Sequence, residues 1–140
     1  MGWNPYHLDR RVQKIVLDAR ARDNDSLNQA YKMRATCAYG LERFWGEYLR
    51  LAESDAHKAD FLKDVWYAFV EIMQTSNITT IPKQMASRNE AEAAIQQVAD
   101  ALWSLPRDHQ QAALAVLTNF CDAVVWWTQR LKKPSERDSL

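Results

Sequence analysis

Glycine, proline and cysteine are all scarce in this sequence. Three glycines and four prolines among 140 residues leave little material for the tight turns of an all-β fold. The two cysteines, Cys37 and Cys121, are too few for a disulfide framework. Both fall on apolar helix faces, where cysteine behaves as a small buried hydrophobe. We therefore expect a helical protein with structural thiols in a reducing compartment.

Net charge and an apolar leader are also lacking. Eighteen basic and eighteen acidic residues cancel, so no global field draws the chain toward nucleic acid or an anionic membrane. The first residues contain no apolar signal-peptide core. Asn119 and Asp122 interrupt the long apolar segment 106–134 near its middle, where a carboxylate is costly in lipid. The sequence thus predicts a cytoplasmic protein that does not enter the membrane.

Helical periodicity accounts for most of the chain, and 47% hydrophobic residues are enough for a substantial core. Apolar positions recur every three or four residues in segments 7–22, 27–52, 55–75, 87–103 and 106–131. This pattern predicts an all-α, single-domain bundle of about five helices, with two antiparallel hairpins and an N-terminal helix. Residues 1–6 form an arm, 76–86 a long loop in which Ile78 and Ile81 pack on the core, and 134–140 a frayed tail.

The last predicted helix carries the clearest indication of binding. Its core-facing side chains are Ala113, Val116, Leu117, Phe120, Ala123, Val124, Trp127 and Leu131. Trp126 lies outside this stripe, in a sector with Asn119, Asp122 and Arg130, a composition typical of binding hot spots. The other interpretation is that a second layer of the same protein covers Trp126. Trp3, on the N-terminal arm, either docks on the bundle or contacts a partner.

Basic residues gather at both ends of the chain. Arg10, Arg11 and Lys14 lie on the outer face of the first helix, and Lys132 and Lys133 follow the last one. A solvated face is the ordinary interpretation of such residues. If the two ends lie together, these side chains form a local patch for nucleic-acid phosphates or an acidic partner.

Arg34 is a charged residue within the apolar stripe of segment 27–52. A buried guanidinium is tolerated only when it is paired. We expect Arg34 to reach the surface or to pair with an acidic residue of a neighbouring helix, and a ligand-facing cation is the alternative. Gly40 and Gly46 weaken the same helix and indicate a close helix approach or a bend.

Three carboxylates support a metal-binding hypothesis. Asp60, Asp64 and Glu71 share one strip of segment 55–75, and they could hold a divalent cation if a second helix supplied ligands. A solvated face is the ordinary alternative. Residues 97–103 resemble the metal-binding helix of all-helical nucleotide pyrophosphohydrolases, which implies magnesium-dependent hydrolysis. Because Gln97 stands where that family has a glutamate, no site is transferred from the resemblance.

The sequence contains no glycine-rich phosphate loop, no Cys/His pair at zinc spacing and no nucleophile elbow. We therefore predict no catalytic residue and no cofactor. The favoured function is a non-enzymatic protein-interaction module that binds a second copy of itself or another protein. A small helical accessory subunit of a larger complex, which includes a nucleoprotein complex, is part of the same hypothesis. The alternative is a magnesium- or manganese-dependent all-α nucleotide hydrolase that uses the carboxylate strip.

Overall fold

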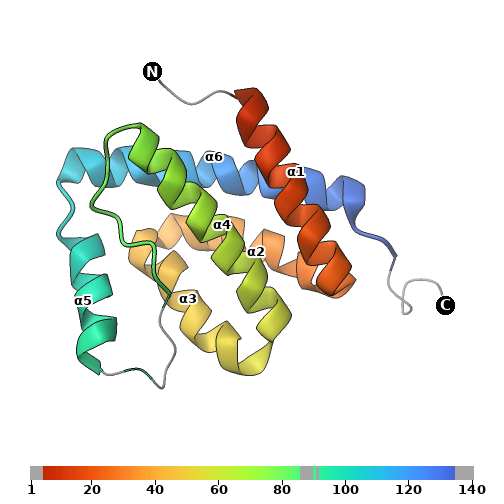
Figure 1. Cartoon of the computed structure of the whole chain (residues 1–140), viewed down its shortest axis with the longest axis horizontal. Helices are drawn as coiled ribbons and strands as arrows, with labels where there is room; N and C mark the ends of the chain where they lie inside the picture. Colours follow the sequence, from red (N-terminus) through yellow and green to blue (C-terminus); the bar gives the residue numbers. More distant parts are fainter. Residues whose placement is uncertain (1–4, 86–89, 91, 135–140) are drawn as a thin grey trace.

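The computed structural model describes residues 5–85, 90 and 92–134, and in this part the chain is all-α, as the sequence predicts (Figure 1). The helices are α1 (Pro5–Arg22), α2 (Gln29–Thr36), α3 (Leu41–Ser54), α4 (Ala56–Thr75), α5 (Glu92–Trp103) and α6 (Arg107–Leu131). Two 3₁₀ turns, η1 (Asn24–Asn28) and η2 (Cys37–Tyr39), flank α2. None of the described helices combines the length and the apolar character that a membrane span requires.

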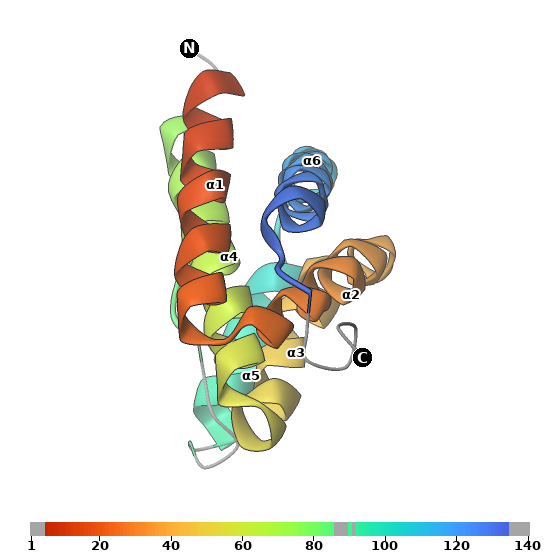
Figure 2. The same ribbon diagram turned by 90° about the vertical axis from the view of Figure 1, so that its right-hand side faces the viewer.

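The helices pack in two groups, which Figure 2 separates clearly. On one side α1 and α4 run side by side, joined by ion pairs of Arg11 with Glu71 and of Arg22 with Asp64. On the other side α6 packs between α1 and α2. Helix α3 packs beneath α4, and α5 packs on α3. This arrangement leaves one face of α6 uncovered between α1 and α2.

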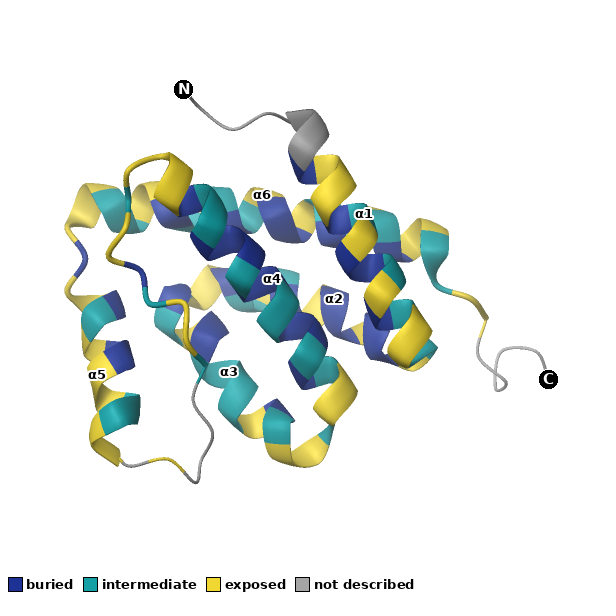
Figure 3. Cartoon of the chain, viewed as in Figure 1, coloured by how far each residue is buried: buried dark blue, intermediate teal, exposed yellow. Residues whose placement is uncertain are grey.

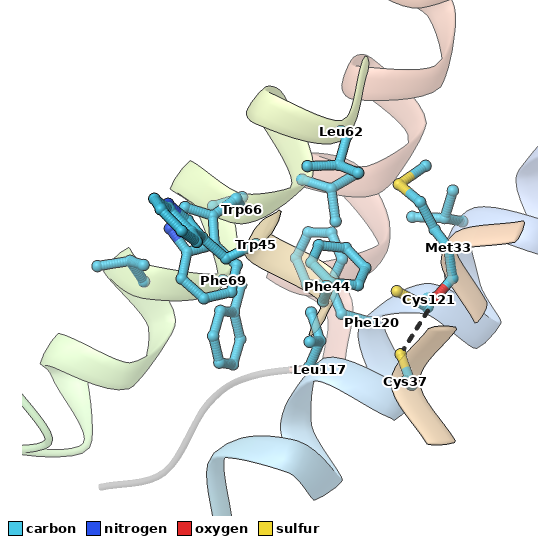
Figure 4. Close-up of a cluster of buried hydrophobic side chains, with 14 of the residues drawn as sticks. Met33, Cys37, Phe44, Trp45, Leu62, Trp66, Phe69, Leu117, Phe120 and Cys121 are labelled. Atoms are coloured by element: carbon cyan, nitrogen blue, oxygen red, sulfur yellow. Dashed lines mark hydrogen bonds between the residues drawn. The ribbon is translucent and has the colours of Figure 1, made fainter. Parts of the chain in front are cut away.

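The core is centred on α4 rather than on α6. Nine side chains of α4 are buried: Ala59, Phe61, Leu62, Val65, Trp66, Ala68, Phe69, Val70 and Met73. The Trp66 ring stacks on Phe44 of α3 at a centroid distance of 6.0 Å and contacts Phe69 at 5.3 Å (Figure 4). Such aromatic pairs add about 0.5–1.5 kcal/mol each to the free energy of burial. Figure 3 shows the result: the middle of α4 is buried or intermediate throughout, whereas exposed positions recur along α6.

The segment 27–52, which we expected to form one helix, is divided at Gly40. Gly40 has φ +97° and ψ 176°, a conformation that is accessible almost only to glycine. Its N–H donates to the Cys37 carbonyl oxygen at 3.2 Å, which closes η2. The apolar pattern did not reveal this division because α2 and α3 each bury a helical stripe, so hydrophobic residues recur on both sides of it. Gly46 lies inside α3 and causes no break.

The long loop after α4 is fastened to the core by two tryptophans. The Trp66 indole N–H donates to the Pro82 carbonyl oxygen at 3.0 Å, and the Trp45 indole N–H donates to the Gln84 carbonyl oxygen at 3.2 Å. Ile81, next to Pro82 in the chain, is buried, as its position predicts. The loop therefore has a structural role, because it covers the aromatic core.

Helix α6 begins without a side-chain cap. Pro106 occupies the capping position and makes no side-chain capping hydrogen bond. Instead, the Gln110 side chain donates to the carbonyl oxygens of Trp103 and Leu105 at 3.1 and 2.8 Å. These bonds tie the start of α6 to the end of α5 and hold Trp103 beside α6.

Candidate interaction surface

The exposed aromatic side chains concentrate on elements around α6. Among the described residues, four large hydrophobic side chains are exposed, with exposed fractions between 47% and 70%: Tyr31, Tyr39, Trp103 and Trp126. They belong to α2, η2, the end of α5 and α6. The described parts of α1, α3 and α4 expose none. Burial of aromatic surface is therefore incomplete on this side of the molecule.

Three hollows follow the line where α6 meets its neighbours. The first, of about 280 Å³, lies between Tyr39, Trp103 and Leu114. The second, of about 440 Å³, continues from Leu114 to Asn119. The third, of about 480 Å³, lies between Tyr31 and the end of α6.

We call this surface the α2–α6 seam. Its members are Tyr31, Tyr39, Trp103, Leu114, Ala115, Thr118, Asn119, Trp126, Gln129 and Lys132. Leu114 and Lys132 are separated by roughly 27 Å along the helix axis, at 1.5 Å per residue. The seam is therefore long enough to contact several turns of a partner helix.

Trp126 lies on the exposed ridge of α6, and the prediction that it falls outside the core stripe is confirmed. Its side chain is half exposed, so no second layer among the described residues buries it. The Arg130 guanidinium stacks over the Trp126 ring at 4.0 Å from the centroid and lies 5.9 Å from that of Trp127. A cation over an exposed indole contributes about 0.5–1 kcal/mol. Arg130 thus packs on one face of the Trp126 ring at the surface.

An ion pair crosses the middle of the seam. Arg34 Nε of α2 donates to Asp122 Oδ1 of α6 at 2.5 Å. The two side chains are 40% and 57% exposed, so the interpretation of Arg34 as a buried charge is wrong, and its expected pairing with a neighbouring helix is found. Met33 and Cys37 form the buried contact of α2 with α6, and Arg34 lies at the edge of that contact, where it reaches solvent. An exposed pair of this kind contributes about 0.2–1 kcal/mol.

Of the remaining predicted binding residues, one lies in the seam and one lies outside the described part of the chain. Asn119 is exposed and lines the second hollow of the seam. Trp3 lies outside the described residues. Tyr31, Tyr39 and Trp103 were missed, although each is a large aromatic near a helix end, a sequence feature that was available.

The basic residues of α1 do not join those of α6. Arg11 pairs with Glu71 of α4, and Lys14 pairs with a carboxylate one turn further along α1 at 3.1 Å. Arg10 is exposed. In the part of the chain that the structure describes, no ion pair or hydrogen bond links these cations to the end of α6.

The end of α6 is instead tied to the end of α1 and to η1. Arg20 donates to the Leu131 carbonyl oxygen at 3.0 Å, and Asn24 exchanges two hydrogen bonds with the Lys133 backbone at 2.7 and 2.9 Å. The Lys132 ammonium lies 3.9 Å from a carboxylate of η1. The end of α6 is therefore held by hydrogen bonds to its backbone, and the charge of Lys132 lies near an acidic side chain of the same chain.

The carboxylate strip of α4 is balanced in the same way. Its ion pairs are Asp60–Lys63 at 3.7 Å, Asp64–Arg22 at 3.1 Å, Glu71–Lys83 at 2.9 Å and Glu71–Arg11. Hydrogen bonds from Lys83 and Arg11 hold the pKa of the Glu71 carboxyl below its ordinary value. Among the described residues no three metal-ligating side chains gather. Asp64 and Glu71 therefore join α4 to α1, and Glu71 also joins it to the loop after α4, whereas Asp60 pairs within α4.

No protein-family model matches this chain, and neither does any curated protein or any solved structure. The structure defines an all-α protein with an uncovered aromatic seam along α6. Its function is accordingly argued from that seam.

Proposed function

We propose that this protein is a non-enzymatic interaction module, or a small helical accessory subunit of a larger complex, that binds a protein partner through the α2–α6 seam. The observation that carries the proposal is the concentration of all four exposed large hydrophobic residues of the described chain around this seam. Exposed aromatic side chains that gather around one helix are typical of contact sites. In keeping with two free thiols, we place the protein in the cytoplasm.

The shape of the seam favours a helical partner segment. The exposed face of α6 carries the small side chains of Ala112 and Ala115 in its first half and the large side chain of Trp126 in its second half. Small side chains allow close approach of another helix, and an aromatic side chain supplies an anchor for it. An amphipathic helix laid along α6 would cover Trp126 and fill the hollow beside Trp103. Both the second copy of this chain and a different protein can present such a helix.

The charges along the seam favour protein over nucleic acid. Nucleic-acid binding depends on several cations that exchange counterions for phosphates. Here Arg34 is paired with Asp122, and Lys132 lies near an acidic side chain. Zero net charge also leaves two copies of the chain without mutual repulsion. Aromatic burial, rather than phosphate contact, is therefore the proposed source of affinity.

Position-specific photo-cross-linking tests this proposal. Benzoylphenylalanine is introduced at Trp126, at Tyr39 or, as the matched control, at Lys14, which is exposed on α1. We expect a discrete protein cross-link at the two seam positions and none at the control position. Mass spectrometry of the product then separates a second copy of the chain from a different protein. The same products at all three positions, or nucleic acid alone at the seam, would overturn the proposal.

A further inference from the structure

The two cysteines meet at the contact between α2, η2 and α6, although they are far apart in the sequence. Cys37 is the first residue of η2 and Cys121 lies in α6, and their exposed fractions are 2% and 0%. Both are free thiols. Figure 4 shows the two sulfur atoms next to each other, with the Cys37 thiol donating to the Met33 carbonyl oxygen at 3.4 Å.

The surroundings make the two thiols chemically unequal. Interaction with the Cys121 thiol, and then the positive charge of Arg34, lower the pKa of Cys37 against the opposing effects of burial and Asp122. Interaction with Cys37 and burial raise the pKa of Cys121 well above its ordinary value. Of the pair, Cys37 is thus the thiol that ionises more readily.

Cys37 lies directly behind one of the side chains that line the second hollow of the seam. Thr118 interacts with the Cys37 thiol and also lines the second hollow of the seam. Arg34, one turn before Cys37, is 40% exposed at the surface of the same contact. Displacement of the Thr118 side chain would therefore expose Cys37 to a small oxidant in this hollow.

The backbone at Cys37 can adapt to a covalent bond. A disulfide requires an S–S distance near 2.05 Å and an allowed dihedral geometry, so packed thiols must shift slightly to form one. Cys37 lies in a three-residue turn that ends at Gly40, not inside a long helix. Small rotations in this turn move the Cys37 sulfur without breaking α6.

We propose that Cys37 and Cys121 are a redox-sensitive pair that forms an intramolecular disulfide when the protein meets hydrogen peroxide. The Cys37 thiolate attacks one peroxide oxygen, and the O–O bond breaks to give a sulfenic acid and hydroxide. The Cys121 sulfur then attacks the Cys37 sulfur and displaces the sulfenic oxygen, which leaves as water with the Cys121 proton. Two thiols lose two electrons in total, and the peroxide is reduced to two water molecules.

The disulfide would lock η2 onto α6 within the α2–α6 seam. Tyr39 lies two residues after Cys37, so the disulfide would fix the turn that carries this exposed aromatic side chain. The inference rests on the cysteine geometry alone and does not depend on the proposed function. Its test therefore uses the purified chain without any partner.

The experiment treats the reduced, full-length protein with a few equivalents of hydrogen peroxide, blocks free thiols with N-ethylmaleimide and measures intact mass. We expect a monomer two hydrogens lighter that takes up no maleimide, a Cys37–Cys121 peptide after digestion, and a higher melting temperature reversed by dithiothreitol. Cys121→Ser should accumulate sulfenic acid at Cys37, which dimedone traps. Cys37→Ser should leave Cys121 unoxidised under the same conditions.

Three results would overturn the inference. In the first, both thiols of the native protein stay reduced in the presence of peroxide. In the second, disulfides form only between chains. In the third, the thiols are oxidised no faster than the protein unfolds globally, a rate measured separately in urea. Circular dichroism checks that each variant is folded. If a serine variant fails to fold, the peptide map of the wild-type protein and its reaction rate still decide the question.

Discussion

Replacing Gly40 tests the division of the predicted long helix into α2 and α3. The substitution Gly40→Ala places a Cβ where the structure has no heavy atom within 4 Å, so it causes no steric clash with neighbouring residues. Its cost comes from the backbone, because φ +97° is strained for any residue with a side chain. Strain of this kind costs about 1–3 kcal/mol. We expect Gly40→Ala to lower the free energy of unfolding by that amount.

Gly46→Ala is the matched control with the opposite expected sign. Gly46 lies inside α3, and its added Cβ would lie 3.5 Å from Glu42 Oε1, an ordinary contact. Alanine in a helix interior is favoured over glycine by about 0.5–1 kcal/mol. Urea unfolding followed by circular dichroism and tryptophan fluorescence measures both variants. If Gly40→Ala stabilises the protein as Gly46→Ala does, segment 27–52 is one continuous helix and the described break is wrong.

Three further predictions concern the surface. Trp126→Ala should lower the free energy of unfolding by no more than about 1 kcal/mol, chiefly through the lost contact with Arg130, and should reduce any self-association seen by light scattering. A loss of several kcal/mol would show that Trp126 is buried. Glu71→Gln should cost about 0.5–1 kcal/mol at pH 7. Because the pKa of Glu71 is lower in the folded than in the unfolded protein, its carboxylate adds stability above the unfolded-state pKa, and this stability is lost as pH falls through the folded-state pKa. The wild-type protein and Glu71→Gln should therefore unfold with the same free energy in strong acid. A difference in stability that persists there would contradict the ion pairs of Glu71 as its source. Millimolar magnesium should leave the melting temperature unchanged, since Asp60 and Asp64 already pair with cations of the chain. A metal-dependent rise that Asp60→Asn with Asp64→Asn abolishes would instead support the hydrolase alternative.

Local sequence patterns were sufficient for the helices that have unambiguous ends. The predicted segments 7–22 and 27–52 left a gap between them, and Asp23 caps the turn η1 in that gap by accepting from the Asp25 N–H at 3.2 Å. The stripe of α6 predicted its buried side, and Leu117, Phe120 and Val124 are fully buried. Gly40 was recognised as a weak point. Its left-handed conformation depends on how α2 and α3 pack against other helices, which periodicity within one segment does not contain.

The candidate surface was only partly predictable for a related reason. A helical wheel places Trp126 off the core stripe because this is a property of one helix. The meeting of Tyr39 with Trp103 depends on tertiary packing between segments far apart in the chain. The same holds for Cys37 and Cys121, which each looked like an isolated buried thiol. Contacts between residues so far apart in the sequence can be identified only from the tertiary structure.

Hydroxyl-radical footprinting measures most directly whether the α2–α6 seam is a contact surface. The oxidation rates of Trp103 and Trp126 are compared between the purified chain and the chain inside its own cells, with exposed residues of α1 as the internal reference. The interaction proposal predicts that both tryptophans are oxidised readily in the purified chain and are protected in the cell, while the reference residues are unchanged. Equal oxidation of the two tryptophans in both settings would mean that nothing covers the seam, and would contradict the proposed function.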